Sequence, residues 1–555
     1  MNKIVIVFLC LVFTSCQNKQ TSLKGIANQK SQWVDSIYNN MTLQEKVGQL
    51  FMVAAYSNRN NAHTDSIKKM ITNNHLGGLV FFQGGPVRQA TLTNAYQSIS
   101  KVPLMIGIDA EWGLNMRLDS TSRYPYNMTL GAISNDSIIY KIGMQIGKDC
   151  RRMGIHVNFA PVVDINTNPK NPIIGVRSFG EDKYNVTKKA IAFTNGLQSQ
   201  GVLACAKHFP GHGDTATDSH KTLPTISFDA KRIDSVELYP FKKVFNSGIA
   251  SVMVAHLNVP SLESTEGLPS SLSHNIVTHI LKEKLGFKGL IFTDALNMKG
   301  AANYKNPGDI DLAAFKAGND VLLFSENAPK AISLIIEAYN VQDISDERLE
   351  YSVKKILEAK FDTNLNQYQP IEISNLISDL NTIDNESLYH DVISKAITVV
   401  KNDNQLLPIA KKNKKKVAYV KIGNGKNVEF LNTLESFTQV DVLTETNLEV
   451  LLKKTKKYDL VIVGYHQANA RKTLAISKNN QLWIQKIAKN SNVILSAFSS
   501  LYCLSNLSFK NIETVLVAYE NSSVSQKATA QIIFGEYKAV GKLPASINSE
   551  LQMNY

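Results

Sequence analysis

Short apolar runs alternate with longer amphipathic stretches from Trp33 onward. Runs of about four to eight apolar residues are typical of buried strands, and apolar residues spaced about three or four apart are typical of helices. We expect eight strands, at residues 48–54, 78–82, 104–109, 157–164, 202–208, 251–256, 289–294 and 320–324. Helical patterns lie between most of them, including 134–153, 183–200 and 274–285. This alternation predicts an α/β fold in which residues 31–365 form a (β/α)8 barrel of the TIM type.

The C-terminal part of the chain shows a second alternating pattern. Residues 367–385 are polar and irregular, so we expect a linker over 366–390. Beyond it, a helical stretch at 390–397 is followed by strand-like runs at 398–401, 417–422, 460–464, 493–497 and 514–518. The pattern predicts a doubly wound α/β sandwich over residues 391–555. No phosphate-binding glycine fingerprint is found, and Gly423-Asn424-Gly425 is more typical of a turn.

Polar residues close five of the apolar runs in the first domain. These residues are Asp109, Asp164, His208, His256 and Asp294. The C-terminal ends of the strands carry the active site in barrels of this type. One such residue is easily explained as a helix cap or a turn residue, but five together favour a functional site.

Residues 206–220 read Ala-Lys-His-Phe-Pro-Gly-His-Gly-Asp-Thr-Ala-Thr-Asp-Ser-His and are expected to form a loop after the fifth strand. Asp218 and His220 are two apart, so in an extended loop the carboxylate can orient the imidazole as a general acid/base. A zinc pair is disfavoured because Pro-Gly separates His208 from His212, which excludes a shared helix face. We therefore expect no metal and no cofactor. A purely structural polar loop is the other alternative.

Asp294 follows the buried run at 289–294 and is expected to project into the mouth of the barrel. A carboxylate in that place is a candidate nucleophile. The alternative is that Asp294 caps the helix that follows.

Asp109 and Glu111 form an acidic pair beside Trp112. Carboxylates accept vicinal hydroxyls and an aromatic ring covers an apolar sugar face, so this trio suits a carbohydrate. Arg177, on a glycine-flanked loop, and Lys207 are expected to donate to hydroxyls or to pair with Asp109. An exposed ion pair is the alternative for Arg177.

These stretches resemble glycoside hydrolase family 3, in its bacterial β-N-acetylglucosaminidase branch. The matching segments are 158–164, 175–182, 207–220, 269–273 with 286–289, and 292–298. The resemblance implies a retaining exo-hydrolase that removes terminal β-linked N-acetylglucosamine from peptidoglycan fragments or other glycans containing this sugar. It implies that Asp294 is the nucleophile and that the His220–Asp218 dyad is the acid/base. It also implies sugar-binding roles for Asp109, Arg177, Lys207 and His208.

The sequence departs from the family at one edge of the predicted pocket. Members often have Gln-Glu-Gly-Gly-Arg after the aspartate, whereas this chain has Ala-Glu-Trp-Gly-Leu at 110–114, with Arg117 further on. Three alternative functions stay open: a family 3 β-glucosidase or β-xylosidase, a β-N-acetylglucosaminide phosphorylase, and an inactive glycan-binding lipoprotein. A substrate-assisted hexosaminidase would need an adjacent Asp-Glu pair, and Asp346-Glu347 is instead expected to cap a helix.

The N-terminus has the layout of a secretory signal, with Lys3 before an apolar run at 4–13 that is too short to span a bilayer. The segment 1–16 resembles a bacterial lipoprotein signal ending at Cys16, so we expect export and either a lipid anchor followed by a tether over 17–30 or a periplasmic protein. Of the five cysteines, Cys150, Cys205 and Cys503 would remain, which is too few and too scattered for a disulfide framework.

Composition narrows the class of protein further. With 44% hydrophobic and 19% charged residues, the chain is typical of a soluble globular protein. The net charge of +13 includes basic clusters at 411–416 and 453–457. No aromatic-interleaved basic motif accompanies them, so we interpret them as solvated faces and expect no nucleic-acid partner.

Overall fold

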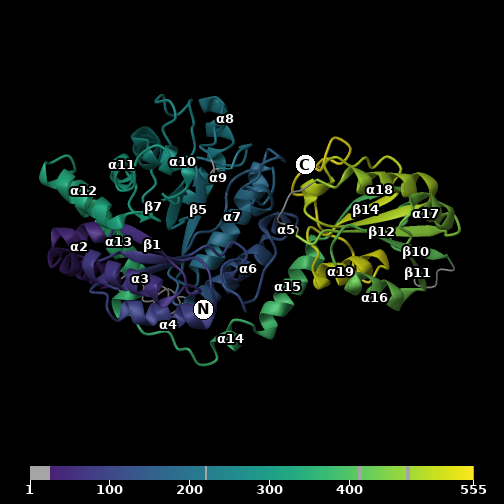
Figure 1. The fold of residues 1–555 in the computed structure, drawn as a ribbon, viewed down its shortest axis with the longest axis horizontal. Coiled ribbons are helices and arrows are strands. Elements are labelled where there is room, and N and C mark those ends of the chain that lie inside the picture. The colour runs from purple at the N-terminus through teal and green to yellow at the C-terminus, as the bar shows by residue number, and fades with distance from the viewer. Residues whose placement is uncertain (1–24, 219–221, 411–414, 470–474, 554–555) are drawn as a thin grey trace, which may run out of the picture.

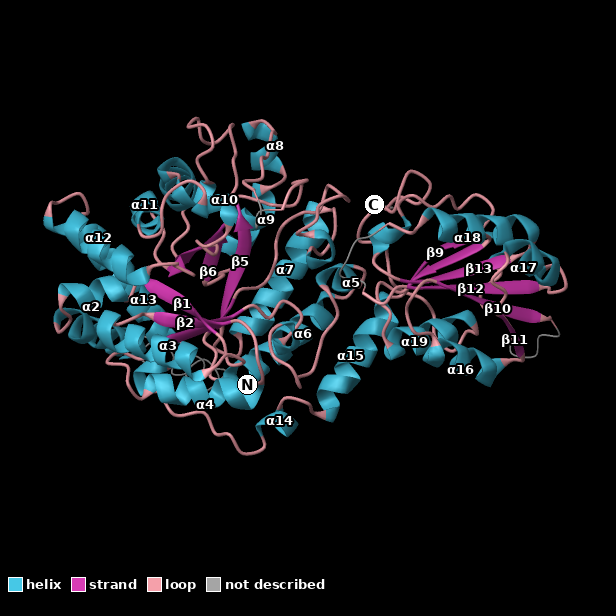
Figure 2. Ribbon diagram, viewed as in Figure 1, coloured by secondary structure: helices cyan, strands magenta, loops and turns pink. Residues whose placement is uncertain are grey.

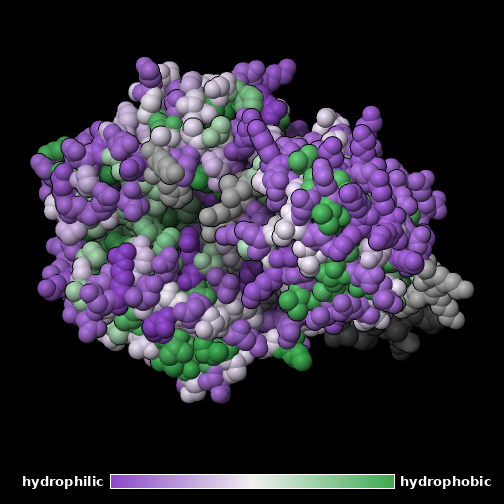
Figure 3. Space-filling view, turned by 45° about the vertical axis from the view of Figure 1, so that its right-hand side comes forward, coloured by the Kyte–Doolittle hydropathy of each residue, from purple (hydrophilic) through white to green (hydrophobic). Residues whose placement is uncertain are grey.

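The computed structural model describes residues 25–218, 222–410, 415–469 and 475–553. The predicted signal peptide, with Cys16, and most of the predicted tether lie outside these residues. Within them, no helix is long and apolar enough to cross a membrane. The face of the molecule seen in Figure 3 is mostly hydrophilic, with smaller hydrophobic patches.

The first domain is an eight-stranded parallel barrel, as predicted. Its strands are β1 (Phe51–Ala55), β2 (Gly78–Phe81), β3 (Met105–Ile108), β4 (Val157–Asn158), β5 (Leu203–Phe209), β6 (Ser251–Val254), β7 (Leu290–Thr293) and β8 (Leu322–Leu323). The hydrogen-bonded order is β7-β6-β5-β4-β3-β2-β1-β8. A parallel bridge between Phe292 and Val321 joins the two ends of this sheet and closes the barrel. Nearly all strand residues are buried, because helices cover the outside and side chains fill the inside.

Helices surround the barrel strands (Figure 2). They are a helix at 25–39, then α2 (Leu43–Gly48), α3 (Asn61–Asn74), α4 (Pro86–Gln97), α5 (Asn127–Gly131), α6 (Asp136–Arg152), α7 (Lys183–Gln198), α8 (Ala230–Ser235), α9 (Leu238–Asn246), α10 (Lys299–Ala302), α11 (Asp309–Ala317), α12 (Ala328–Asn340) and α13 (Asp346–Asp362). Short 3-10 turns lie at η1 (Leu114–Met116), η2 (Gly175–Arg177) and η3 (Ser270–Leu272). The helix expected at 274–285 is present as the π-helical η4 (Asn275–Lys284).

The first predicted strand began too early. Residue Gly48 belongs to α2, because Thr42 and Glu45 form a capping box that starts a helix just before it. β4 is also far shorter than the predicted 157–164. Its chain bends away after Asn158, where the side chain of Asn158 bonds to the backbone of Ala110 instead of continuing the ladder.

The second domain is a six-stranded sheet with helices on both faces, as predicted (Figure 2). Its strands are β9 (Thr398–Asn402), β10 (Val417–Ile422), β11 (Val440–Leu443), β12 (Leu460–His466), β13 (Val493–Phe498) and β14 (Thr514–Val517), in the order β11-β10-β12-β13-β14-β9. Only the β14–β9 pairing is antiparallel. The edge strand β11 was not predicted, because the middle two of its four residues are exposed and its apolar run is short.

Alternate residues of the central strands explain the two helical layers. In β12, Leu460 and Ile462 pack with α16 (Val428–Phe437) and α19 (Ser523–Ile533), whereas Val461 and Val463 face the side of α17 (Leu448–Thr455) and α18 (Lys478–Asn490). The remaining elements are η5 (Leu365–Gln367), α14 (Leu376–Asp379), α15 (Ile383–Ala396), η6 (Asp403–Gln405) and η7 (Leu501–Leu504). The second half of the predicted linker is therefore helical.

The two domains lie side by side, with α5 between them (Figure 1). Buried polar contacts join them. Arg123, on a loop of the barrel, pairs with the buried carboxylate of Glu520 at 3.2 Å, and Tyr389 of α15 donates to the same carboxylate. The second domain therefore packs directly against loops of the barrel.

Lys360, in α13, allows a test of the barrel core. Its side chain is fully buried, and its Nζ donates to Gln49 Oε1 at 2.6 Å. Burial lowers the pKa of Lys360 to about 7, whereas unfolded lysine titrates near about 10.4. Between these pH values the unfolded chain binds more protons than the folded one, so stability rises with pH across that window. We expect the Tm of Lys360→Met to exceed that of the parent protein most near about pH 6. The difference should shrink towards about pH 9.

The matched control is Lys354→Met on the same helix. Lys354 is partly exposed and pairs with Asp35 and Glu350, so its removal should show no such change between about pH 6 and pH 9. Thermal unfolding of the parent protein and both variants at the two pH values provides the measurement. A Tm difference for Lys360→Met that is the same at both would contradict a buried neutral lysine.

Candidate active site

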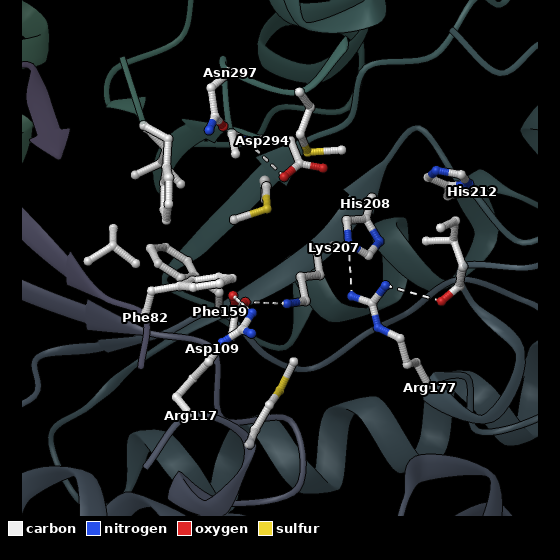
Figure 4. A pocket seen from close by; sticks show the side chains of 18 of the residues that line it. Phe82, Asp109, Arg117, Phe159, Arg177, Lys207, His208, His212, Asp294 and Asn297 are labelled. Atoms are coloured by element: carbon white, nitrogen blue, oxygen red, sulfur yellow. Dashed lines mark hydrogen bonds and ion pairs between the residues drawn. The ribbon is translucent and has the colours of Figure 1, made fainter. Parts of the chain in front are cut away.

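A cavity of about 440 Å³ opens at the C-terminal ends of the barrel strands. Five of the predicted site residues line it together: Asp109 after β3, Arg177 in η2, Lys207 and His208 in β5, and Asp294 after β7 (Figure 4). Its other wall is aromatic and consists of Tyr56, Phe82, Phe159 and Phe324. The barrel therefore collects groups from four separate stretches of sequence at one point.

Two consecutive residues of β5 face the same cavity. Side chains of a regular strand alternate between its two faces. The pairing of β5 with β6 shifts between Lys207 and Phe209, so that Lys207 opposes Met253 and Phe209 opposes Val254. This irregularity lets both Lys207 and His208 line the pocket.

Asp109 is held by two cations. Lys207 Nζ lies 2.8 Å from its Oδ1, and Arg117 donates to its Oδ2 at 2.5 Å. Burial alone would raise the pKa of Asp109, but Lys207 and Arg117 hold it far below its usual value. Burial would likewise lower the pKa of Lys207, yet the neighbouring carboxylates raise it. Both groups are therefore charged at neutral pH. The role of Arg117 was not predicted, because a contact across an irregular loop leaves no periodic signal.

Glu111 lies behind the pocket and supports its cations. Its side chain is fully buried and accepts two bonds from Arg177, at 3.0 Å from Nε and 2.7 Å from an amino group, while Lys207 Nζ lies at 2.8 Å. Although burial favours the neutral acid, Arg177 and Lys207 lower the pKa of Glu111 to about 2. The expectation that Asp109 and Glu111 jointly face hydroxyls is therefore wrong for Glu111.

Trp112 does not line the cavity either. It is buried and packs edge-to-face against Tyr126, with ring centroids 4.9 Å apart. The glycine that follows, Gly113, has a φ of 88°, which turns the chain away from the strand end. The prediction that this indole covers a bound ring is wrong, and Phe82 and Phe159 occupy the pocket wall instead.

Asp164 orients His208 from outside the cavity. Its Oδ2 lies 2.7 Å from His208 Nδ1, and its Oδ1 accepts the backbone amides of His208 and His212. The Nε2 of His208 is 3.3 Å from an amino group of Arg177. This strand-end carboxylate therefore fixes the orientation of the imidazole at the edge of the pocket.

Asp294 is the remaining carboxylate of the cavity, and within the described residues it forms no ion pair with lysine or arginine. Its Oδ1 accepts the amide of Ala295 at 2.8 Å. Burial would raise the pKa of Asp294, but His208, His256 and that amide together lower it. The helix-cap alternative is wrong, because the next helix, α10, begins at Lys299 with Met298 as its cap. Asp294 therefore presents an ionised carboxylate to the pocket.

His256 supports the chain next to Asp294. Its Nε2 donates to the carbonyl of Ala295 at 3.0 Å, and its Nδ1 lies 2.7 Å from Ser271 Oγ. Burial is the main cause that lowers the pKa of His256. His256 thus bonds to the backbone and, unlike three of the five strand-end residues, does not line the pocket.

His212 was given no role by the sequence, yet it lines the cavity. Its Nδ1 lies 2.7 Å from Thr215 Oγ1, and burial lowers the pKa of His212 to about 4. Arg117, Asn297 and Met298 also line the pocket without having been predicted to do so. In the described part of the chain, no group of three His, Cys, Asp or Glu side chains is arranged to hold a metal ion.

The predicted dyad is only partly described. Asp218 is half-buried, and its carbonyl accepts the amide of Thr222 at 3.0 Å. His220 lies outside the described residues. The pairing of Asp218 with His220, and the position of that imidazole relative to Asp294, therefore stay predictions.

Glu111→Gln tests the buried charge network. Removing one partner from a buried ion pair costs about 3–5 kcal/mol, because it leaves uncompensated charge. We expect a large fall in Tm at neutral pH. The carboxylate's contribution is complete above about pH 4.3 and is lost as the pH falls towards the folded pKa of about 2, so the difference between parent and variant should shrink in acid.

Glu283→Gln is the control for this comparison. Glu283 pairs with His279 on the exposed surface at 2.7 Å, so its loss should change the free energy of unfolding by less than about 1 kcal/mol. Thermal melts of both variants from acid to neutral pH provide the measurement. Equal, small effects of the two substitutions would rule out a cooperative network around Glu111.

Family models and known proteins are similar to this chain. The sequence matches the Glycosyl hydrolase family 3 N terminal domain over residues 42–359 and the C-terminal domain of that family over 397–555. β-Hexosaminidase A of Pseudoalteromonas piscicida is 34% identical over 373 residues, which are 61% of this chain but only 62% of that protein. A β-hexosaminidase of Nitrosomonas eutropha is 29% identical over 299 residues, 52% of this chain and 85% of that protein.

A solved structure matches over both domains. It is a glycoside hydrolase family 3 β-N-acetylglucosaminidase from Paenibacillus sp. str. FPU-7, with a TM-score of 0.76 and 30% identity over 92% of this chain and 99% of that one. The family match covers more than half of the chain, and the two-domain fold agrees with it. The chain belongs to glycosyl hydrolase family 3.

Proposed function

We propose that this protein is a retaining exo-glycosidase that removes terminal β-linked N-acetylglucosamine from glycans. The observation that carries the proposal is the contrast between the two carboxylates of the pocket. Asp109 is paired with two cations, whereas Asp294 carries a lowered pKa and, within the described residues, no lysine or arginine partner. An ionised but uncommitted carboxylate is what a glycosidase nucleophile requires. The hexosaminidase names of the relatives support the choice of sugar.

The charged floor of the pocket suits the non-reducing end of a chain. The Asp109 oxygens keep lone pairs after binding Lys207 and Arg117, so they can accept sugar hydroxyls. Lys207 and Arg177 can donate to neighbouring hydroxyls, and His208 Nε2 lies at the same edge. Phe82 and Phe159 offer apolar surface for the ring. Donors, acceptors and apolar rings gathered in one cavity of about 440 Å³ suit the terminal sugar of a chain, so we propose exo-cleavage.

Two chemical steps follow from this arrangement. Asp294 attacks the anomeric carbon while protonated His220 gives its proton to the leaving oxygen, and a covalent glycosyl-enzyme forms. Neutral His220 then takes a proton from water, which attacks the same carbon and releases Asp294. Asp218 orients the imidazole throughout. A histidine in this role also avoids placing a second carboxylate beside Asp294, where the like charge would raise a pKa.

We further propose that the substrates include peptidoglycan fragments. A lipid on Cys16 would hold the enzyme at a membrane surface after export. The cationic pocket and the overall charge of +13 would favour glycans that carry anionic groups.

Substrate and stereochemistry can be tested together. We expect hydrolysis of an aryl β-N-acetylglucosaminide at a kcat/KM well above that of the matching β-glucoside and β-xyloside. Proton NMR should show the β-anomer of N-acetylglucosamine as the first product, because double displacement retains configuration. Turnover should not depend on phosphate. Release of the α-anomer, preference for the glucoside, or formation of a sugar 1-phosphate in phosphate buffer would each overturn the proposal.

Variants of the acid/base separate its role from that of the nucleophile. His220→Ala should lose about 10²–10⁴-fold in turnover of substrates with poor leaving groups, and much less in the first step for aryl groups that leave without a proton. Asp218→Asn should behave in the same way, because it loses the orienting charge. Asp294→Ala should be inactive on both kinds of substrate.

Asp214→Asn is the control on the same loop. Asp214 accepts the hydroxyl of Thr167 at 2.8 Å and does not line the pocket, so activity should be kept. Rates measured over a series of aryl leaving groups test whether His220 acts as the acid. An equal loss for good and poor leaving groups in His220→Ala would exclude this residue as the acid.

A further inference from the structure

The turn that carries Arg177 is bonded to the second domain through Asn166. Asn166 follows β4 and is 1% exposed. Its Oδ1 accepts the amide of Gly175, the first residue of η2, at 3.0 Å, and its Nδ2 donates to the hydroxyl of Tyr502 at 2.9 Å. Tyr502 belongs to η7 of the second domain and is 3% exposed. One buried amide therefore links the second domain to the turn that places a guanidinium in the pocket.

The other end of the same segment is also held by the second domain. The amide of Glu181 donates to the carbonyl of Pro544 at 3.0 Å, and its carboxylate accepts the hydroxyl of Ser546 at 2.6 Å. The approach is close, since a Cβ on Gly180, where φ is 144°, would lie 2.2 Å from the carbonyl oxygen of Pro544. Residues 175–181 are thus linked to the second domain at both ends, through Asn166 at residue 175 and directly at residue 181.

This segment is irregular, so few of its own backbone bonds fix it. Loop positions of this kind open at low free energy unless other groups hold them. Arg177 extends from η2 to reach both Glu111 and His208, with its amino group 2.7 Å from the carboxylate and 3.3 Å from the imidazole. A small displacement of the turn would therefore move a donor at the floor of the cavity.

We propose that Tyr502 and Asn166 are positioning residues for the sugar-binding half of the pocket, so that the second domain sets the affinity of the barrel for its substrate. The reacting carboxylate is placed differently: Asp294 is held by β6, β7 and His256, all within the barrel. Loss of the Tyr502 bond should therefore weaken binding more than it slows the chemical step. The proposal rests on the proposed function only in that Arg177 contacts the substrate.

Tyr502→Phe removes one hydroxyl and keeps the packed ring. We expect KM for the aryl β-N-acetylglucosaminide to rise about 5- to 50-fold, because misplacing a contact by less than about 1 Å has effects of this size, while kcat changes less than about twofold. Asn166→Ala should raise KM at least as far. The double variant should be no worse than Asn166→Ala alone, because both substitutions break the same link.

Tyr519→Phe is the matched control. Tyr519 is another buried tyrosine of the second domain, and its hydroxyl lies 2.7 Å from Oγ1 of Thr398, which belongs to the same domain. The substitution removes the same group at a similar cost in Tm but should leave KM unchanged. Equal KM values for Tyr502→Phe, Tyr519→Phe and the parent would overturn the proposal, as would additive effects in the double variant. The parent protein's activity is measured first, and if it prefers another glycoside, KM is determined with that one. Failure of the proposed function is thereby distinguished from failure of this inference.

Discussion

The structure depends on a set of charges buried together beneath the pocket. Asp109, Lys207, Glu111 and Arg177 alternate in sign, and their contacts are between 2.7 and 2.8 Å. A charge of this kind is costly to bury alone and tolerable only when its partners are in place. Arg117 adds a further cation at Asp109. The five side chains together therefore carry a net positive charge. Because each depends on its partners, they must become ordered together.

The pocket also keeps a second carboxylate ionised: burial opposes this, but His208, His256 and the amide of Ala295 favour the charged form, with a smaller contribution from Lys207. Asp294 stands across the cavity from Lys207 and is not paired with it (Figure 4). The positive charge of Lys207 favours the ionised form of Asp294. Within the described residues, neither of its oxygens forms an ion pair with lysine or arginine. The same arrangement requires the whole fold. The charges come from the ends of β3 and β5 and from η2, so they meet only when the barrel closes and the second domain packs against the η2 segment.

Much of the fold could be predicted because burial leaves a periodic signal. The barrel strands are apolar runs and their helices repeat every three or four residues, so β2, β6, α7 and β10 lie within a residue or two of their expected bounds. The edge strand β11 was not predicted, because half of its residues face solvent. β4 is short because, just past its pairing with β3 and β5, the side chain of Asn158 takes up the backbone of Ala110, which is a tertiary contact that no local pattern records.

The site was predictable to the extent that it sits on strand ends. Asp109, Lys207, His208 and Asp294 end such runs and do meet in one cavity. Directions of side chains on the loop at 110–117 were not predictable. Residues in irregular backbone have no fixed alternation, so the adjacent Glu111 and Trp112 could not be assigned to the pocket or to its support. The resemblance to family 3 supplied the proposed nucleophile and the proposed dyad, but not the contacts through which the second domain reaches Arg177.

The most direct measurement is a crystal structure of the enzyme trapped with a fluorinated N-acetylglucosaminyl donor whose intermediate hydrolyses slowly. We expect the anomeric carbon to be bonded to an oxygen of Asp294, the sugar hydroxyls to face Asp109 and Lys207, and the imidazole of His220 to lie across the ring plane from Asp294. A bond to another carboxylate, or a cyclised acetamido group with Asp294 uninvolved, would contradict the central claim.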